Sequence, residues 1–255
     1  MVLTHSHQTI NFVSIRRRFD FRSIEMGRWV TPDERDRAAV KFHQALEDLM
    51  AILQGPEHLI SLRGTLGLQY GKGGRPGVAA HYMPATRQLS LAKNAGAGAL
   101  AHEWFHAYDH FICEKMFVDQ PSSYFASRCW IDSAPMYLSK NSQPHPLNQL
   151  LANCFRTVLL SEDGDKPSNL FLSSQQADQR LNILYYAKPE EMCARAFEAF
   201  VEDAAPASPF LVKGTRFSEE AKAGLYPHGD QRLRINSAFE RYFSSLGSAL
   251  YRELA

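Results

Sequence analysis

Two histidines four residues apart, His102 and His106, have the spacing of a metal-binding pair. On a helix, residues four apart lie on one face, so both imidazoles can direct a nitrogen at a single cation about 2 Å away. Glu103 follows His102 directly and lies beside the same position. In a His-Glu-x-x-His pattern the histidines bind zinc, and the glutamate is the general base toward water that the metal activates. The pattern therefore predicts a Zn²⁺ site that supports hydrolysis.

A catalytic zinc needs a third protein ligand and keeps a fourth position open for water. A further histidine at the short spacing of some such motifs would supply it, but position 112 is Ile112. The other common solution is a carboxylate from a later helix, and residues 189–198 are rich in glutamate. We expect Glu191 to be the third ligand, with Glu190 and Glu198 as alternatives.

Asp109 follows His106 by three residues and His102 by seven, so it could accept a hydrogen bond from a ligand histidine and orient the ring. The competing interpretation is that the two histidines only pack on a half-buried helix face. Burying both beside a carboxylate without a cation would leave costly polar groups in the core. The metal site is therefore the favoured interpretation.

Composition narrows the class of protein. The chain has 255 residues, of which 45% are hydrophobic, so it can bury a sizeable core. Its net charge of +1 gives no long-range field to gather nucleic acid, which is not expected as a direct ligand. No apolar stretch is long enough to span a bilayer, no signal-peptide core is present, and the four cysteines form no Cys-x-x-Cys pair. We expect a cytoplasmic protein with reduced thiols and no membrane contact.

The elements around the motif follow from periodicity and turn residues. Thr31-Pro32-Asp33-Glu34 predicts the capped start of a helix that ends near Gly55-Pro56. Residues 10–30 read as short extended segments, and strands are expected at 59–62, 66–70, 78–82 and 88–91. Helices are expected at 94–117, 147–160, 174–185, 190–203 and 231–253.

This order predicts an α+β fold in one catalytic domain. Residues 1–93 form a helix and sheet lobe, and residues 94–117 form the metal-binding helix. Residues 118–186 are an insertion that could act as a lid, and residues 187–255 form a helical lobe with the third ligand. We expect the strand of Gln88, Leu89, Ser90 and Leu91 to border the cleft, where an extended polypeptide substrate can add as one more strand.

Residues 96–110, GAGALAHEWFHAYDH, resemble the zincin metallopeptidase motif. Together with residues 19–22, 62–68, 80–82 and 190–198, they are similar to the large polyvalent protein-associated domain 1 family and to the bacterial proteins labelled CLCA-X. The resemblance covers residues 10–115 and 180–245. It implies a zincin-like fold and a setting in bacteria, phages or conjugative elements.

The helix at 190–198 is also similar to one in the catalytic domain of anthrax lethal factor, where an acidic residue precedes an aromatic-rich helix. This similarity implies that Glu191 is the third ligand. It also implies a tyrosine just before the helix that stabilises the transition state, and Tyr185 and Tyr186 lie near that place. Either hydroxyl could donate a hydrogen bond to the developing oxyanion.

Two other functions are compatible with the same residues. One is a non-catalytic, metal-stabilised interaction module of a phage or mobile-element system, against which the intact Glu103 argues. The other is a zinc amidase that acts on non-protein amides, for instance in cell-wall peptides. The lack of an export signal argues against the second.

Overall fold

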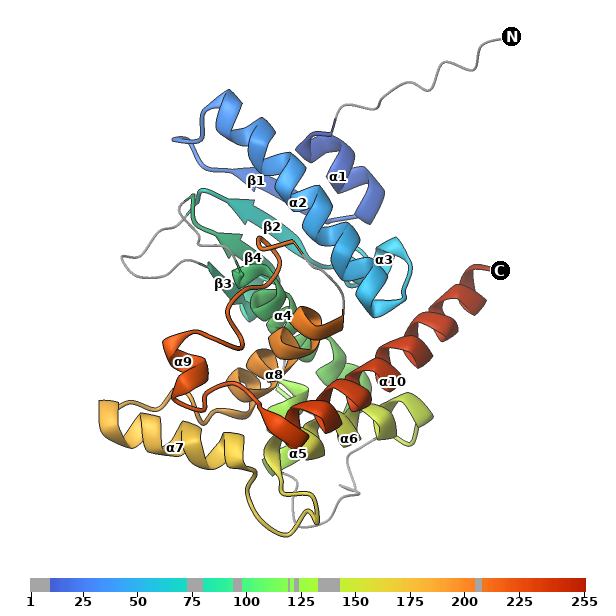
Figure 1. The fold of residues 1–255 in the computed structure, drawn as a ribbon. Coiled ribbons are helices and arrows are strands. Elements are labelled where there is room, and N and C mark those ends of the chain that lie inside the picture. The colour runs from blue at the N-terminus through green and yellow to red at the C-terminus, as the bar shows by residue number, and fades with distance from the viewer. Residues whose placement is uncertain are drawn as a thin grey trace.

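The computed structural model describes residues 10–72, 80–93, 98–118, 120–121, 124–132, 143–204 and 208–255. It shows an α+β fold in which a small mixed sheet is joined to a larger set of helices (Figure 1). The predicted fold class is confirmed at this level. The glycine-rich segment at residues 71–77 lies, from residue 73 on, outside the described residues.

The first described helix, α1 (Phe12–Phe19), precedes β1 (Ser23–Met26). Asn11 caps α1 because its side chain accepts from the amides of Val13 and Ser14, and the amide of Asn11 donates to the hydroxyl of Ser14 at 3.0 Å. The prediction of extended segments only in residues 10–30 is therefore wrong. The cap and the buried face of Phe12, Ile15 and Phe19 favour a helix here.

The next helix, α2 (Pro32–Leu53), confirms the predicted capping box. Thr31 accepts from the amide of Glu34, and Glu34 accepts from the amide of Thr31. The short helix α3 (Glu57–Ile60) replaces the strand expected at 59–62. Its two apolar residues are buried, and two adjacent buried residues fit one side of a helical turn as well as a short strand.

The sheet contains β1, β2 (Gly67–Tyr70), β4 (Gln88–Leu91) and β3 (Ala80–Met83), in that order. β1 pairs with β2 and β2 with β4 in parallel, whereas β3 pairs with β4 antiparallel. A 3₁₀ turn, η1 (Pro84–Thr86), joins β3 to β4. The described sheet thus ends in an antiparallel strand.

The helix with the histidine pair is α4 (Ala99–Met116). Gly98 precedes it at φ +107°, and a Cβ there would lie 2.8 Å from the amide nitrogen of Lys213. The amide of Ala101 donates to the carbonyl of Leu211 at 3.0 Å. A later segment of the chain therefore supplies the cap of α4 through its backbone.

The remaining helices are α5 (Ala126–Asp132), α6 (Pro146–Leu159), α7 (Asn169–Leu181), α8 (Pro189–Ala204), α9 (Glu219–Lys222) and α10 (Gly229–Leu254). α6, α8 and α10 lie close to their expected ranges. α5 was not predicted, and α7 begins and ends earlier than expected. α6 packs on α10 with Phe155 and Val158 fully buried, so this part of the region 118–186 is core rather than lid.

An aromatic core joins α4 to the two long later helices. The rings of Phe105 and Phe197 lie 4.9 Å apart, and Phe239 and Phe243 pack around them from α10. Trp104 donates its indole N–H to the carbonyl of Ile60 at 2.9 Å. This packing fixes α4 against α8, the two helices that carry the expected ligands. None of the described helices has the length and apolarity needed to cross a membrane.

Candidate metal centre

The structure brings His102 and His106 of α4 together with Glu191 of α8. Among the described residues, these three side chains form a group that could hold a metal ion. One potential ligand atom from each of them lies within 4.8 Å of the other two. The Nε2 atoms of the two histidines are 3.0 Å apart. Glu191 places Oε2 at 3.3 Å from His102 Nε2 and Oε1 at 3.5 Å from His106 Nε2.

These separations match the edges of a tetrahedral zinc site. Ligand atoms about 2.0–2.1 Å from a zinc ion lie roughly 3.3 Å from one another when the site is tetrahedral. The side chains are also shielded, with 16% exposed for His102, 9% for His106 and 13% for Glu191. Two imidazole nitrogens and a carboxylate at these distances fit Zn²⁺ in both donor type and spacing.

Glu198, two turns after Glu191 on α8, binds the outer nitrogen of His102. Its Oε1 lies 2.6 Å from His102 Nδ1, and its Oε2 accepts from the hydroxyl of Tyr226 at 3.1 Å. Such a carboxylate fixes the orientation and tautomer of a ligand histidine. Glu198 was considered as an alternative third ligand. In the structure it instead contacts the candidate ligand His102 at Nδ1 and is not part of the group of candidate ligands. Tyr226 carries no signal in the sequence that would have identified it.

The charges of the cluster depend on one another. Burial opposes the charged form of His102, but the carboxylates of Glu198 and Glu191 outweigh it and raise the pKa of His102 to about 10. Burial favours the neutral form of Glu191, yet hydrogen bonds from His102 and His106 hold the pKa of Glu191 well below its usual range. Without a metal, the cluster is thus a charged imidazolium between carboxylates.

Glu103 and Tyr185 lie at the same cluster. Glu103 follows His102 on α4 and is half-buried, and its charge contributes to the raised pKa values of both His102 and Tyr185. Burial of the Tyr185 hydroxyl and its interaction with the Glu191 carboxylate raise the pKa of Tyr185, so this hydroxyl keeps its proton at neutral pH. The ring of Tyr186 instead lies under the guanidinium of Arg195, at 5.3 Å. Of the two tyrosines, the structure associates Tyr185 with the cluster.

Asp109 does not orient a ligand histidine, so that prediction is wrong. Its carboxylate accepts from the backbone amide of Ser127 at 2.9 Å and from the Ser127 hydroxyl. These bonds tie α4 to α5, and burial raises the pKa of Asp109 to about 7 against their effect. Among the described residues, none hydrogen-bonds to the buried Nδ1 of His106.

The strand Gln88–Leu91 is not a free edge, which overturns its predicted role as a docking strand. β4 pairs with β2 on one side and β3 on the other, and Ser90 lies opposite both Gln69 and His81. Leu89 and Leu91 are buried because the strand is central in the sheet. The strand at this edge is β3, which Tyr82 fixes to α4 by a 2.7 Å contact between its hydroxyl and His110 Nδ1.

The turn before α8, residues 182–188, is fixed by two buried side chains. Asp178 accepts from the backbone amides of Tyr185, Tyr186 and Ala187 at 3.2, 2.8 and 3.0 Å. Arg195 donates to the Tyr186 carbonyl at 2.6 Å. The two residues were not predicted from the sequence, because only the fold brings α7 and α8 to this turn.

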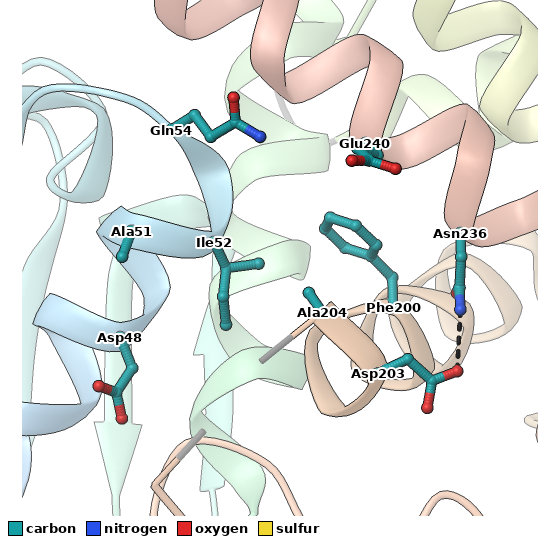
Figure 2. A pocket seen from close by; sticks show the side chains of 9 residues that line it. All are labelled: Asp48, Ala51, Ile52, Gln54, Phe200, Asp203, Ala204, Asn236 and Glu240. Carbon is teal, nitrogen blue, oxygen red and sulfur yellow. Dashed lines mark hydrogen bonds between the residues drawn. The ribbon is translucent and has the colours of Figure 1, made fainter. Parts of the chain in front are cut away.

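A cavity of about 450 Å³ lies away from the cluster, between α2, α8 and α10 (Figure 2). Asn236 donates to Asp203 at 2.8 Å, and Arg232 binds both oxygens of that carboxylate. Asp48 accepts from the amide of Ser208 at 2.8 Å. Two of the acidic groups that line the cavity therefore already have partners within the fold.

Comparison with known families gives one match. Residues 177–250 match the model of the large polyvalent protein-associated domain 1. The match includes α8 with Glu191 and Glu198, and leaves out α4 and the rest of the predicted resemblance at residues 10–115. No curated protein matches the chain. No solved structure matches it either.

Proposed function

We propose that the chain is a zinc-dependent metallohydrolase of zincin-like fold that cleaves peptide bonds. The observation that carries the proposal is the grouping of three side chains: the Nε2 atoms of His102 and His106 are 3.0 Å apart, and the two carboxylate oxygens of Glu191 lie 3.3 and 3.5 Å from them. Glu103 lies next to it on the helix. An antiparallel edge strand, β3, runs beside α4 and supports the comparison with zincins.

His102, His106 and Glu191 would hold the ion and leave one position for water and substrate. When bound, zinc supplies a Lewis acid that makes water a stronger nucleophile at neutral pH. The carboxylate of Glu103 takes a proton from the attacking water and returns it to the nitrogen of the leaving amine. The protonated hydroxyl of Tyr185 donates a hydrogen bond to the oxygen of the scissile carbonyl as charge develops on it.

An extended polypeptide fits the edge of β3 better than that of β4. The outer side of β3 is unpaired in the described sheet, whereas both sides of β4 are paired. A peptide that adds to β3 would form main-chain hydrogen bonds next to α4. This arrangement keeps the predicted binding mode and changes the strand that provides it.

The test compares three proteins purified without chelator and supplied with zinc. Wild type is expected to hold about one zinc per chain, as a site with three protein ligands requires, and to cleave a fluorescent, unfolded casein substrate. Glu103→Gln should keep the zinc and lose cleavage, because the amide fills the space but does not accept the proton. Glu191→Ala should lose the zinc.

The controls separate the competing functions. Glu190→Gln, on the same helix, should change neither zinc content nor cleavage. A zinc-loaded wild type that cleaves no peptide would contradict the proposal and favour an interaction module. Turnover of a non-peptide amide without cleavage of casein would favour the amidase instead.

A further inference from the structure

The end of α7 and the turn that follows it expose large apolar side chains. The exposed fractions are 58% for Leu181, 41% for Ile183, 86% for Leu184 and 42% for Tyr185. These four residues lie within five consecutive positions, so the end of α7 and the turn form an apolar segment at the surface. Apolar surfaces of this kind mark contacts with another molecule.

This surface is built on a fixed backbone. Asp178 accepts from three consecutive amides of the turn, and Arg195 donates to the carbonyl of Tyr186. Asp178 is 6% exposed and Arg195 5%, so both anchors are in the interior. Leu184 therefore protrudes from a segment that cannot easily fold it inward. A side chain held ready in this way loses little entropy when a ligand covers it.

The same turn reaches the metal cluster. The amide of Lys188 donates to the carbonyl of Tyr185, and the amide of Glu191 donates to the carbonyl of Lys188, both at 3.1 Å, so the turn runs directly into the end of α8 that carries Glu191. Consecutive Cα atoms are about 3.8 Å apart. Leu184 is the residue before Tyr185, so a molecule bound at Tyr185 and Glu191 lies near the turn that carries Leu184. The molecule expected to cover the apolar surface is the substrate.

We propose that Ile183 and Leu184 determine substrate specificity by contacting a bulky aliphatic or aromatic side chain that flanks the cleaved bond of a polypeptide. This inference rests on the proposed function and names the substrate class. The anchored turn sets the distance between that side chain and Tyr185. A polypeptide without a large apolar residue near the scissile bond would leave Leu184 exposed to water and bind more weakly.

Peptide binding can be measured without hydrolysis. Zinc-loaded Glu103→Gln is used to select from a random dodecapeptide phage library, in parallel with Glu103→Gln/Leu184→Ser. Glu103→Gln is expected to enrich Leu, Ile, Met, Phe or Tyr at one aligned position by about tenfold, the value of one apolar contact. The Leu184→Ser protein should lose that enrichment. Zinc content and melting temperature should be equal in the two.

The matched control is Leu254→Ser in the same Glu103→Gln background. Leu254 is 64% exposed and lies at the end of α10, far from α7 (Figure 1). It should keep the enrichment. The inference is overturned if Leu184→Ser selects the same peptides, if no apolar position is enriched, or if the substitution instead reduces binding to phosphatidylcholine vesicles or self-association. Failure of the proposed function appears separately, as absence of casein cleavage by the wild type.

Discussion

The Nδ1 atom of His102 lies 2.6 Å from the carboxylate of Glu198, and this contact decides which nitrogen faces the other ligands. A carboxylate ion can only accept a hydrogen bond, so Nδ1 carries a proton. Nε2 is then directed toward His106 and Glu191. Glu198 thus positions the candidate ligand His102 from the same helix that carries Glu191, the candidate third ligand.

Removal of Glu198 should weaken zinc binding without abolishing it. We expect Glu198→Ala to lower zinc affinity roughly 10–100-fold, the usual effect of losing a carboxylate behind a ligand histidine. Glu198→Gln should have a smaller effect, because its amide oxygen can still accept from Nδ1. Competition with a chromogenic chelator measures both. Equal weakening by Glu190→Gln would show that the effect belongs to the helix and not to this contact.

Zinc binding should release protons at neutral pH. Carboxylates outweigh burial and raise the pKa of His102 to about 10 in the metal-free protein, so at pH 7.5 its ring carries both protons. A ligand imidazole must give up one of them. Calorimetry in buffers of different ionisation enthalpy should therefore report about one proton released per zinc. Affinity should rise as pH increases from 7 to 9, and pH-independent binding would contradict this prediction.

Asp178 should stabilise the turn before α8. Asp178→Ala removes an acceptor from three backbone amides and is expected to lower the free energy of unfolding by roughly 2–5 kcal/mol. Urea denaturation measures the change. Asp165→Ala, at a site whose side chain is 59% exposed, is the control and should change stability by less than about 0.5 kcal/mol. Similar losses in the two variants would argue against the anchoring role.

Asp203 should make stability depend on pH in the acid range. Burial raises its pKa, but hydrogen bonds from Arg232, Asn236 and Arg216 outweigh burial and lower the pKa to about 2. Because the folded-state pKa lies below the unfolded value of about 3.9, the contribution is full above that value and is lost as pH falls through about 2.

The variant Asp203→Asn tests this dependence. At pH 7 it should lower the free energy of unfolding by roughly 3 kcal/mol, because it leaves the buried Arg232 short of a charged partner. Its deficit relative to wild type should shrink by roughly 2 kcal/mol between pH 6 and pH 2, the energy of the pKa shift. Asp36→Asn, at a side chain 62% exposed, is the control. A deficit that stays constant with pH would contradict the assignment.

Patterns of neighbouring residues predicted the helices that have a strong hydrophobic periodicity or a capping motif at their start. The capping box at Thr31 located the start of α2 to the residue, and the histidine pair identified α4. Glu191 was favoured among three glutamates, and the structure groups it with the two histidines. The cap and the histidine pair depend on residues close in sequence, so their spacing is enough to predict them, whereas the choice of Glu191 was supported by a family similarity.

Features set by distant contacts could not be predicted in this way. β4 became a central strand because β3 pairs with its other side, and its alternating sequence does not reveal that partner. Asp109 was within reach of the histidines by helical spacing, but Ser127 of α5 takes its carboxylate. The roles of Glu198, Tyr226 and Asp178 likewise depend on which helices meet.

The cap of α4 has a consequence for how the protein is made. The amide of Ala101 needs the carbonyl of Leu211, and the third ligand of the centre is on α8. During translation from the N-terminus, α4 therefore emerges before its cap exists. His102 and His106 are synthesised before Glu191 and Leu211, so the proposed centre cannot be complete until both of these residues have been made. Assembly of the proposed centre thus depends on residues up to Leu211 and not on the motif alone.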